Sequence, residues 1–238
     1  MFTHPAMPPA VENLERASAL DGIATEALIN RSPELNERLS NALANSAAHG
    51  LPPITISPLQ GQYLAVQCRL KSAKRVLEVG TLGGYSSIWF ASAGASVTSI
   101  EISSKHREVA LLNTKGLDVD VILGAALDVL PKLASDGRVF DLVFVDADWD
   151  EQYEYFEWPV KLTRPGGAVY VDNVVRCMLE GETAGEGEDL VSKVGKMKGV
   201  QATLVWTVGS HKSDVDHMFD GFLLAVVDWG ALFVTVVQ

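Results

Sequence analysis

Between residues 75 and 227, short apolar segments alternate with segments of helical periodicity, and this alternation limits the folds open to the chain. The apolar segments are short enough to be buried strands, and the intervening segments repeat their apolar residues at helical spacing. Strands that alternate with helices form right-handed β–α–β units and a mainly parallel sheet. We predict strands at 75–79, 97–101, 118–123, 141–145, 168–171, 202–207 and 222–227, with helices at 85–92, 105–113, 127–133 and 153–162.

The two ends of the chain have different patterns. Residues 11–49 have helical periodicity, a Gly-Leu-Pro-Pro sequence at 50–53 interrupts it, and a third helix is expected from Pro58 to about Lys71. No clear helix separates the last two predicted strands, which favours an antiparallel end to the sheet. We expect a flexible arm (1–10) and one domain (11–238), with N-terminal helices (11–72) and an α/β core (73–228). The Gly- and Glu-rich residues 177–190 are predicted to form an exposed loop.

Composition excludes several classes of protein. Of the 238 residues, 47% are hydrophobic and 21% charged, which predicts a packed core rather than disorder. A formal net charge of -11 disfavours a nucleic-acid partner. Two cysteines are too few for a disulfide framework. No signal peptide is recognised, and no apolar run approaches the ~18 residues that span a membrane. We therefore expect a cytoplasmic protein with no membrane partner.

The first predicted strand runs into a glycine-rich stretch, Glu78-Val79-Gly80-Thr81-Leu82-Gly83-Gly84-Tyr85-Ser86. Glycines let the backbone approach a ligand, and the following helix offers free N–H groups. The nicotinamide fingerprint G-x-G-x-x-G is absent, which argues against a dinucleotide. A plain turn between strand and helix is the alternative interpretation. Glu101, about 20 residues onward at the end of the second strand, suits an acid that accepts ribose hydroxyls. Together the two features predict an adenosine site.

Acidic and amide side chains follow the fourth and fifth predicted strands. Asp146 comes directly after Val145, and the pair Asp172-Asn173 comes directly after Val171. If these strands are neighbours, the three side chains can offer oxygen ligands at one point. Such ligands suit a hard cation such as Mg²⁺. The alternative is that each acid caps a helix or lines the cofactor pocket.

These segments resemble one family in order and in content. The stretches LEVGTLGGYSSIWFA (77–91), IE (100–101), GAALDVLPKL (124–133), FDLVFVDAD (140–148) and VDNVVR (171–176) resemble the cation-dependent class I S-adenosylmethionine O-methyltransferases. This family contains the catechol and caffeoyl-CoA O-methyltransferases. The residues 51–64 and 220–227 are also similar, so the resemblance covers most of 50–228. It implies a Rossmann-like α/β fold with a seven-stranded, mostly parallel sheet whose last strand is antiparallel.

The resemblance also implies roles for single residues. Gly80 and Gly84 would form the S-adenosyl-L-methionine loop, and Glu101 would bind the ribose. Asp146, Asp172 and Asn173 match the family's metal ligands. The remaining positions expected to contact the cofactor are Glu78, Tyr85, Ser86, Ala125 and Asp146.

Trp149 departs from the family pattern, which usually has a Lys at this position, assigned as the base or as an electrostatic partner of the reacting oxygen. Tryptophan cannot accept a proton at its indole N–H. Either the metal lowers the acceptor pKa sufficiently, or another base acts, or the ordinary activity is lost. Trp149 could instead stack on a flat acceptor or pack against neighbouring loop residues. The candidates for catalysis are Asp146, Trp149 and His211, with Lys212, His217, Asp148 and Asp150 as further possible bases.

These observations predict an O-methyltransferase that transfers a methyl group to a hydroxyl of a small aromatic acceptor, assisted by a divalent cation. A metal-independent methyltransferase, a non-catalytic cofactor-binding protein and, more distantly, a nicotinamide oxidoreductase are the alternatives. A homodimer is also expected, because the family is commonly dimeric and the first 50 residues have apolar stripes that a partner surface could cover.

Overall fold

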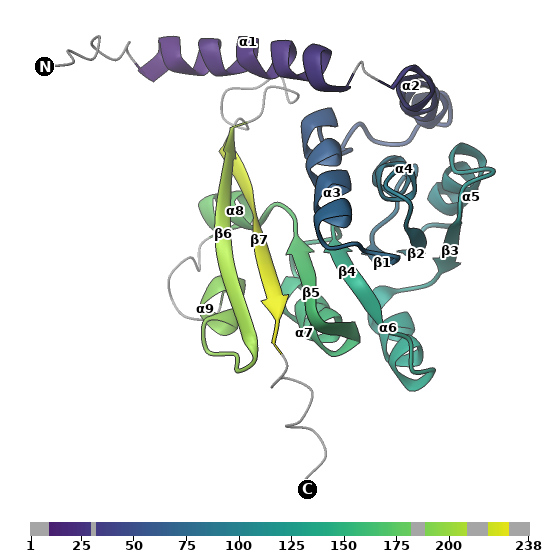
Figure 1. Ribbon diagram of the computed structural model, residues 1–238, viewed down its shortest axis with the longest axis vertical. Coiled ribbons are helices and arrows are strands. Elements are labelled where there is room, and N and C mark those ends of the chain that lie inside the picture. Colours follow the sequence, from purple (N-terminus) through teal and green to yellow (C-terminus); the bar gives the residue numbers. More distant parts are fainter. Residues whose placement is uncertain (1–9, 30–31, 182–188, 209–218, 229–238) are drawn as a thin grey trace, which may run out of the picture.

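The computed structural model describes residues 10–29, 32–181, 189–208 and 219–228 (Figure 1). Three helices come first, α1 (Ala10–Ile29), α2 (Pro33–Ala48) and α3 (Pro58–Leu70). Helix α3 begins where the sequence favours a helix start. Ser57 caps it by accepting a hydrogen bond from the Gln60 N–H at 3.1 Å, and Pro58 occupies the first turn. Residues 1–9, most of the predicted arm, lie outside the described residues, and Ala10 already belongs to α1.

The predicted alternation of strands and helices is confirmed after residue 74. The elements in chain order are β1 (Arg75–Val79), α4 (Tyr85–Ser92), β2 (Ser96–Glu101), α5 (Ser104–Asn113), β3 (Val119–Leu123), α6 (Ala126–Ser135), β4 (Phe140–Val145), α7 (Gln152–Leu162), β5 (Thr163–Val171), α8 (Val174–Glu180), α9 (Leu190–Val194), β6 (Val200–Val208) and β7 (Phe219–Val227).

The strands form a seven-stranded sheet in the order β3-β2-β1-β4-β5-β7-β6. Strands β1 to β5 are parallel, and β7 is antiparallel to both β5 and β6. The predicted Rossmann-like fold with an antiparallel last strand is therefore confirmed. The chain winds outward from β1 in one direction and from β4 in the other. Ligands of open α/β sheets bind at such a reversal, beyond the carboxyl ends of the strands.

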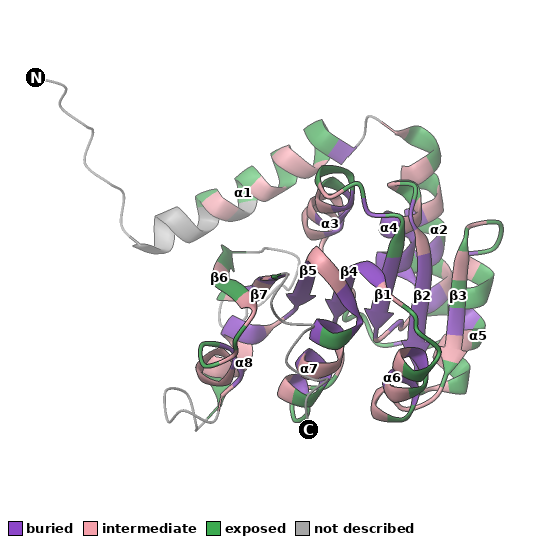
Figure 2. Cartoon of the chain, turned by 60° about the horizontal axis from the view of Figure 1, so that its bottom comes forward, coloured by how far each residue is buried: buried purple, intermediate pink, exposed green. Residues whose placement is uncertain are grey.

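Two apolar layers cover the two faces of the sheet. Val76 of β1 and Phe144 of β4 pack with α2, α3 and α4, whereas Leu77 and Val143 pack with α6, α7 and α9. Successive side chains of a strand point to opposite faces, so strands buried on both faces are apolar at nearly every position. Figure 2 shows the central strands as buried over most of their length.

The prediction of a loop at 177–190 is wrong at both of its ends. Helix α8 continues to Glu180, and α9 begins at Leu190. Glycine and glutamate lowered the expectation of a helix, but an i,i+4 ion pair between Arg176 Nε and Glu180 Oε1, at 2.7 Å, links successive turns of α8. Residues 182–188 of this segment lie outside the described residues.

Helix α1 presents apolar side chains to solvent. Leu20 is 63% exposed and Ile23 is 62% exposed, whereas Ile29 at the end of the helix is buried. Figure 1 shows α1 lying across the end of α3, away from the sheet. The exposed residues are where a second copy could pack, and the homodimer stays a prediction. Within the described ranges, none of the helices combines the length and apolar character that crossing a bilayer requires.

Candidate active site

The loop between β1 and α4 adopts a conformation that requires glycine at two positions. Gly80 has φ +92° and Gly84 has φ +77°, in the region that other residues rarely adopt. A Cβ at Gly80 would also collide with the backbone oxygen of Asp146. The close approach brings the end of β1 against the end of β4, at the reversal of the strand order. Gly80 therefore lets the loop lie against β4 at the position of the site, and Gly84 sets the turn into α4.

The side chain of Glu78 fixes the position of this loop through hydrogen bonds to buried serines. Its carboxylate accepts hydrogen bonds from the hydroxyls of Ser86, at 2.5 Å, Ser99, at 2.6 Å, and Ser87. The side chain is fully buried, and burial raises its pKa despite the three hydroxyl donors. Glu78 was expected to contact the cofactor, but it does not line the pocket described below. Its contacts instead tie the start of α4 to β2.

Glu101 lies at the end of β2 and faces the loop. Its Oε2 accepts the backbone N–H of Leu82 at 2.8 Å and of Thr81 at 3.2 Å, and its Oε1 accepts the N–H of Ser103 at 2.8 Å. His106 Nδ1 lies 3.6 Å from Oε1. A carboxylate has about four lone-pair sites, so three are used and one remains for a ligand hydroxyl. The side chain is thus held in place before any ligand arrives.

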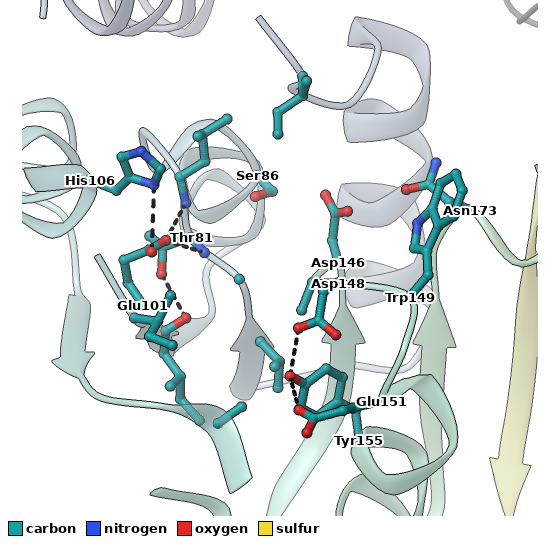
Figure 3. Close-up of a pocket in the computed structure, with 18 of the residues that line it drawn as sticks. Thr81, Ser86, Glu101, His106, Asp146, Asp148, Trp149, Glu151, Tyr155 and Asn173 are labelled. Atoms are coloured by element: carbon teal, nitrogen blue, oxygen red, sulfur yellow. Dashed lines mark hydrogen bonds and ion pairs between the residues drawn. The ribbon is translucent and has the colours of Figure 1, made fainter. Parts of the chain in front are cut away.

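A pocket of about 630 Å³ extends from Glu101 past Asp146 to Asn173 (Figure 3). The end of the pocket at Glu101, its first end, is mostly apolar, and Ile102 and Leu127 are among its lining residues. The predicted cofactor residues that line it are Gly80, Tyr85, Ser86, Glu101, Ala125 and Asp146. Gly84, the N-cap of α4, lies within the loop and is not part of the wall. The strand pairing at the reversal point brings these residues together from four separate loops.

The pairing of β4 with β5 places Asp146 and Asp172 at the same level of the sheet, because Val145 pairs with Val171. Asp172 is 7% exposed, and its Oδ1 accepts a hydrogen bond from Gln60 Nε2 at 2.7 Å. Burial, together with the nearby carboxylates of Asp146 and Asp220, raises the pKa of Asp172 well above its ordinary value. The carboxylates therefore repel one another at this point.

Asn173 completes this group from the N-cap of α8, with φ +56°. Its Nδ2 donates to Asp220 Oδ2 at 2.7 Å, which leaves the amide oxygen directed toward Asp146 (Figure 3). In the described part of the chain, no three His, Cys, Asp or Glu side chains are arranged as a metal cluster. The predicted cation ligands at this edge are the carboxylates of Asp146 and Asp172 and the amide oxygen of Asn173, and the carboxylate of Asp220 lies nearby.

Trp149 lines the second end of the pocket, between Asp148 and Asn173 (Figure 3). The Arg176 guanidinium lies over its ring, with Cζ 5.4 Å from the ring centroid. Tyr155 OH lies 2.7 Å from Asp148 Oδ2 and 2.7 Å from Glu151 Oε2, and burial raises its pKa. Asp148 and Asp150 are both exposed, but only Asp148 is among the residues that line this pocket. His211, Lys212 and His217 lie outside the described residues.

The residues of the site that sequence reasoning missed include Gln60, His106, Tyr155 and Arg176. Arg176 offered a signal, because it closes the VDNVVR segment (171–176) that carries part of the family resemblance. His106 follows Glu101 by five residues at the start of α5. Gln60 offered no such indication, since it lies 112 residues from its partner Asp172.

Comparisons with known proteins show which family the chain is similar to. A family model described as O-methyltransferase matches residues 29–203, which is more than half of the chain. The catechol O-methyltransferase of Mycobacterium tuberculosis is 38% identical over 223 residues, covering 87% of this chain and 94% of that protein.

Two solved structures are also similar. An O-methyltransferase from Bacillus cereus in complex with SAH has a TM-score of 0.79 and 34% identity, covering 90% of this chain and 100% of that one. The O-methyltransferase TomG from Streptomyces achromogenes, in complex with SAM, has a TM-score of 0.77 and 35% identity, covering 90% and 98%.

Proposed function

Because the chain belongs to the class I S-adenosylmethionine-dependent O-methyltransferase family, we propose that it methylates a hydroxyl of a small catechol-like acceptor with the help of a divalent cation. The observation that carries this proposal is the pocket that joins Glu101 to Asp146 and Asn173. Asp172 is buried next to this end of the pocket and does not line it, at the same level of the sheet as Asp146. A donor site and an acceptor site that share one wall at Asp146 suit a transfer between two bound molecules.

The first end of the pocket supports binding of S-adenosylmethionine. Glu101 has one acceptor position left for a ribose hydroxyl, and Ile102, Ala125 and Leu127 offer an apolar slot for a flat base. The glycine loop brings its backbone close to the same space. Two of the similar structures contain the product or the donor of this cofactor pair, which supports the same assignment.

The second end of the pocket supports a cation and an aromatic acceptor. Two carboxylates and an amide oxygen form a donor set that suits Mg²⁺ or a similar hard ion. The repulsion among the carboxylates of Asp146, Asp172 and Asp220 is of the kind that a bound cation offsets. When bound, the cation would lower the pKa of an acceptor hydroxyl, which is near ~10 for a phenol in water. The Trp149 ring offers a flat wall for the acceptor.

The proposed reaction is an in-line displacement. S-adenosylmethionine supplies its methyl group as an electrophilic carbon bonded to a sulfonium. A bond forms between that carbon and the acceptor oxygen, the carbon–sulfur bond breaks with both electrons going to sulfur, and the hydroxyl proton is lost. Trp149 cannot take this proton, so Asp146 and Asp148, the pocket-lining carboxylates that precede it in the same loop, are the proposed acceptors. The chain contributes mainly by orienting both molecules.

Metal-independent methylation of an acceptor without a catechol is the second candidate. Trp149, in place of the lysine that the family usually has, is the observation that favours it. A non-catalytic protein that only binds the cofactor would also retain the Glu101 end of the pocket.

Calorimetric titration with S-adenosylhomocysteine, with and without Mg²⁺, followed by turnover assays in excess chelator, separates these possibilities. We expect binding of the product in both conditions and methylation of catechols only with the cation. Full turnover in chelator would favour the metal-independent enzyme. Binding without turnover on any phenolic acceptor would favour the non-catalytic protein, and an absence of binding would contradict all three.

A further inference from the structure

Arg176 contributes a positive charge to the second end of the pocket, and the proposed reaction does not use it. The residue lies in α8, and its side chain is 20% exposed. Glu180 Oε1 accepts a hydrogen bond from Nε at 2.7 Å, and the Trp149 ring lies beneath the guanidinium carbon at 5.4 Å. These two contacts orient the guanidinium plane. Within the described ranges, its two terminal nitrogens donate no hydrogen bond to another residue.

The surrounding charges make this arginine unusual. The acidic residues on the pocket wall are Glu101, Asp146, Asp148 and Glu151. Among the described lining residues, Arg176 is the one lysine or arginine, and the chain has a formal net charge of -11. An anionic acceptor would be repelled along most of the wall. Arg176 is therefore the point at which such an acceptor would find a favourable partner.

The position of Arg176 relative to the proposed cation ligands is set by α8. Asn173 is the N-cap of this helix and Arg176 is three residues later, and both residues line the pocket. Trp149 follows Asp146 by three residues and lines the same end of the pocket as Asn173 (Figure 3). A flat acceptor whose hydroxyls face Asp146 and Asn173 would thus have its distal substituent near Arg176.

We propose that Arg176 is a specificity-determining residue that binds a carboxylate on the acceptor, so that the preferred acceptors are dihydroxyphenyl carboxylic acids. This inference rests on the proposed function. The planar guanidinium has two terminal nitrogens that match the two oxygens of a carboxylate, and such paired, charged hydrogen bonds are among the strongest in proteins. The cation–π contact with the Trp149 ring already restricts the Arg176 side chain, so that side chain loses less conformational freedom when a carboxylate binds.

The test compares three catechols on the wild type and on Arg176→Gln: unsubstituted catechol, a catechol with a carboxylate and a catechol with an amine. We expect the wild type to have its highest kcat/KM on the carboxylate. The substitution should lower kcat/KM on the carboxylate by about tenfold to a hundredfold, mainly through KM, as for loss of a charged hydrogen bond. The effect on unsubstituted catechol should be no more than about threefold, since that acceptor has no group to bind there.

Two control variants separate this role from a structural one. Arg138→Gln removes another arginine that lies over an aromatic ring, with Cζ 5.6 Å from the Phe140 centroid and outside the pocket. It changes the net charge equally and should leave the preference for the carboxylate intact. Glu180→Gln removes the negative charge next to Nε while keeping an oxygen that can accept its hydrogen bond, and the guanidinium remains, so the preference should be retained or increased. Equal losses on all three catechols in Arg176→Gln would overturn the inference.

Calorimetry keeps the inference testable if no catechol is methylated. Wild-type protein loaded with S-adenosylhomocysteine would be titrated with 3,4-dihydroxybenzoate and compared with Arg176→Gln. Binding that depends on Arg176 without turnover would uphold the carboxylate site and contradict the proposed function. Turnover of unsubstituted catechol without any preference for the carboxylate would uphold the function and overturn the carboxylate site. Neither binding nor turnover would overturn both.

Discussion

The side-chain amide of Gln60 donates a hydrogen bond to the carboxylate of Asp172, with 2.7 Å between Nε2 and Oδ1. Gln60 also donates to Tyr170 OH at 3.3 Å. These bonds connect α3, in the N-terminal helical region, to the end of β5 at the proposed cation site. The helices before residue 72 therefore take part in the site as well as covering one face of the sheet.

Replacing Gln60 by leucine should weaken binding of Mg²⁺ by about 10–100-fold. Residues that orient metal ligands typically have effects of this size when they are replaced. The measurement is the Mg²⁺ dependence of the melting temperature and of turnover. Gln67→Leu, two turns further along the same helix, is the matched control. A Mg²⁺ affinity that is the same in both variants would show that Gln60 does not position Asp172 for a cation.

Replacing Glu101 by alanine should weaken binding of S-adenosylmethionine by ~1.5–3 kcal/mol, the range for a hydrogen bond to a charged group. The variant also removes the acceptor of the Leu82 and Thr81 N–H groups, so its melting temperature should be measured alongside. Glu108→Ala, an exposed change on α5, should bind the cofactor as the wild type does. Unchanged calorimetric affinity in a folded Glu101→Ala protein would contradict the assignment.

A divalent cation should raise the melting temperature of the wild type. At a concentration 100 times the Kd, binding to the folded state alone adds about 2.7 kcal/mol, and each kcal/mol raises Tm by about 2–4 °C in a chain of this size. Asp172→Asn should lose this response. In the absence of a cation, the same variant should be no less stable than the wild type, because it removes one of several mutually repelling carboxylates. If adding Mg²⁺ or Mn²⁺ does not change the Tm of the wild type, the cation site is contradicted.

Replacing Trp149 by lysine should raise turnover on small catechols at neutral pH and shift the pH–rate profile to lower pH. The lysine would add a cation, and a base, to a wall that also contains Asp146, Asp148 and Asn173. General-base assistance contributes about 10²–10⁴-fold in adapted sites, and an unadapted site should recover only a fraction of that. Trp149→Leu removes the ring without adding charge. It therefore separates the effect of a larger pocket from the effect of the lysine amine. An unshifted profile in a well-folded lysine variant would refute this prediction.

Asp141 should stabilise the fold in a pH-dependent way. Burial alone would raise its pKa, but the hydrogen bond from Arg164 and the backbone N–H groups of Arg75 and Lys74 outweigh burial and lower it. A lowered folded-state pKa means that the stabilisation is present above the unfolded-state value of about 3.9 and is lost as pH falls through the folded-state pKa.

Asp141→Asn should therefore cost about 1–3 kcal/mol at pH 7, and the difference from the wild type should shrink as pH falls below about 4. Thermal melts across this range provide the measurement. Asp120→Asn, an exposed change on β3, should have the same thermal stability as the wild type at every pH. A difference in stability that stays constant down to pH 2 would show that the effect does not come from the charge of Asp141.

The order of the elements and the position of the site were predictable from the sequence, because both depend on local patterns. Apolar segments such as 75–79 and 141–145 indicate strands buried on both faces, and the helices between them impose parallel pairing. Parallel strands end at one edge, so Gly80, Glu101 and Asp146 had to lie near one another. Local pattern failed at 177–180, where the ion pair between Arg176 and Glu180 accompanies a helix that the composition disfavoured.

Tertiary structure alone decided what each polar side chain contacts. Glu78 precedes the glycine loop by two residues, yet its side chain points to the face opposite Leu77 and Val79 and is satisfied by three serines in the core. Gln60 reaches Asp172 because α3 packs over β5, a contact that no spacing in the sequence encodes. Arg176 lies over Trp149 because neighbouring strands bring two loops together. Hydrogen bonds and charge pairs of this kind depend on distances between segments, which the sheet topology sets only after the chain has folded.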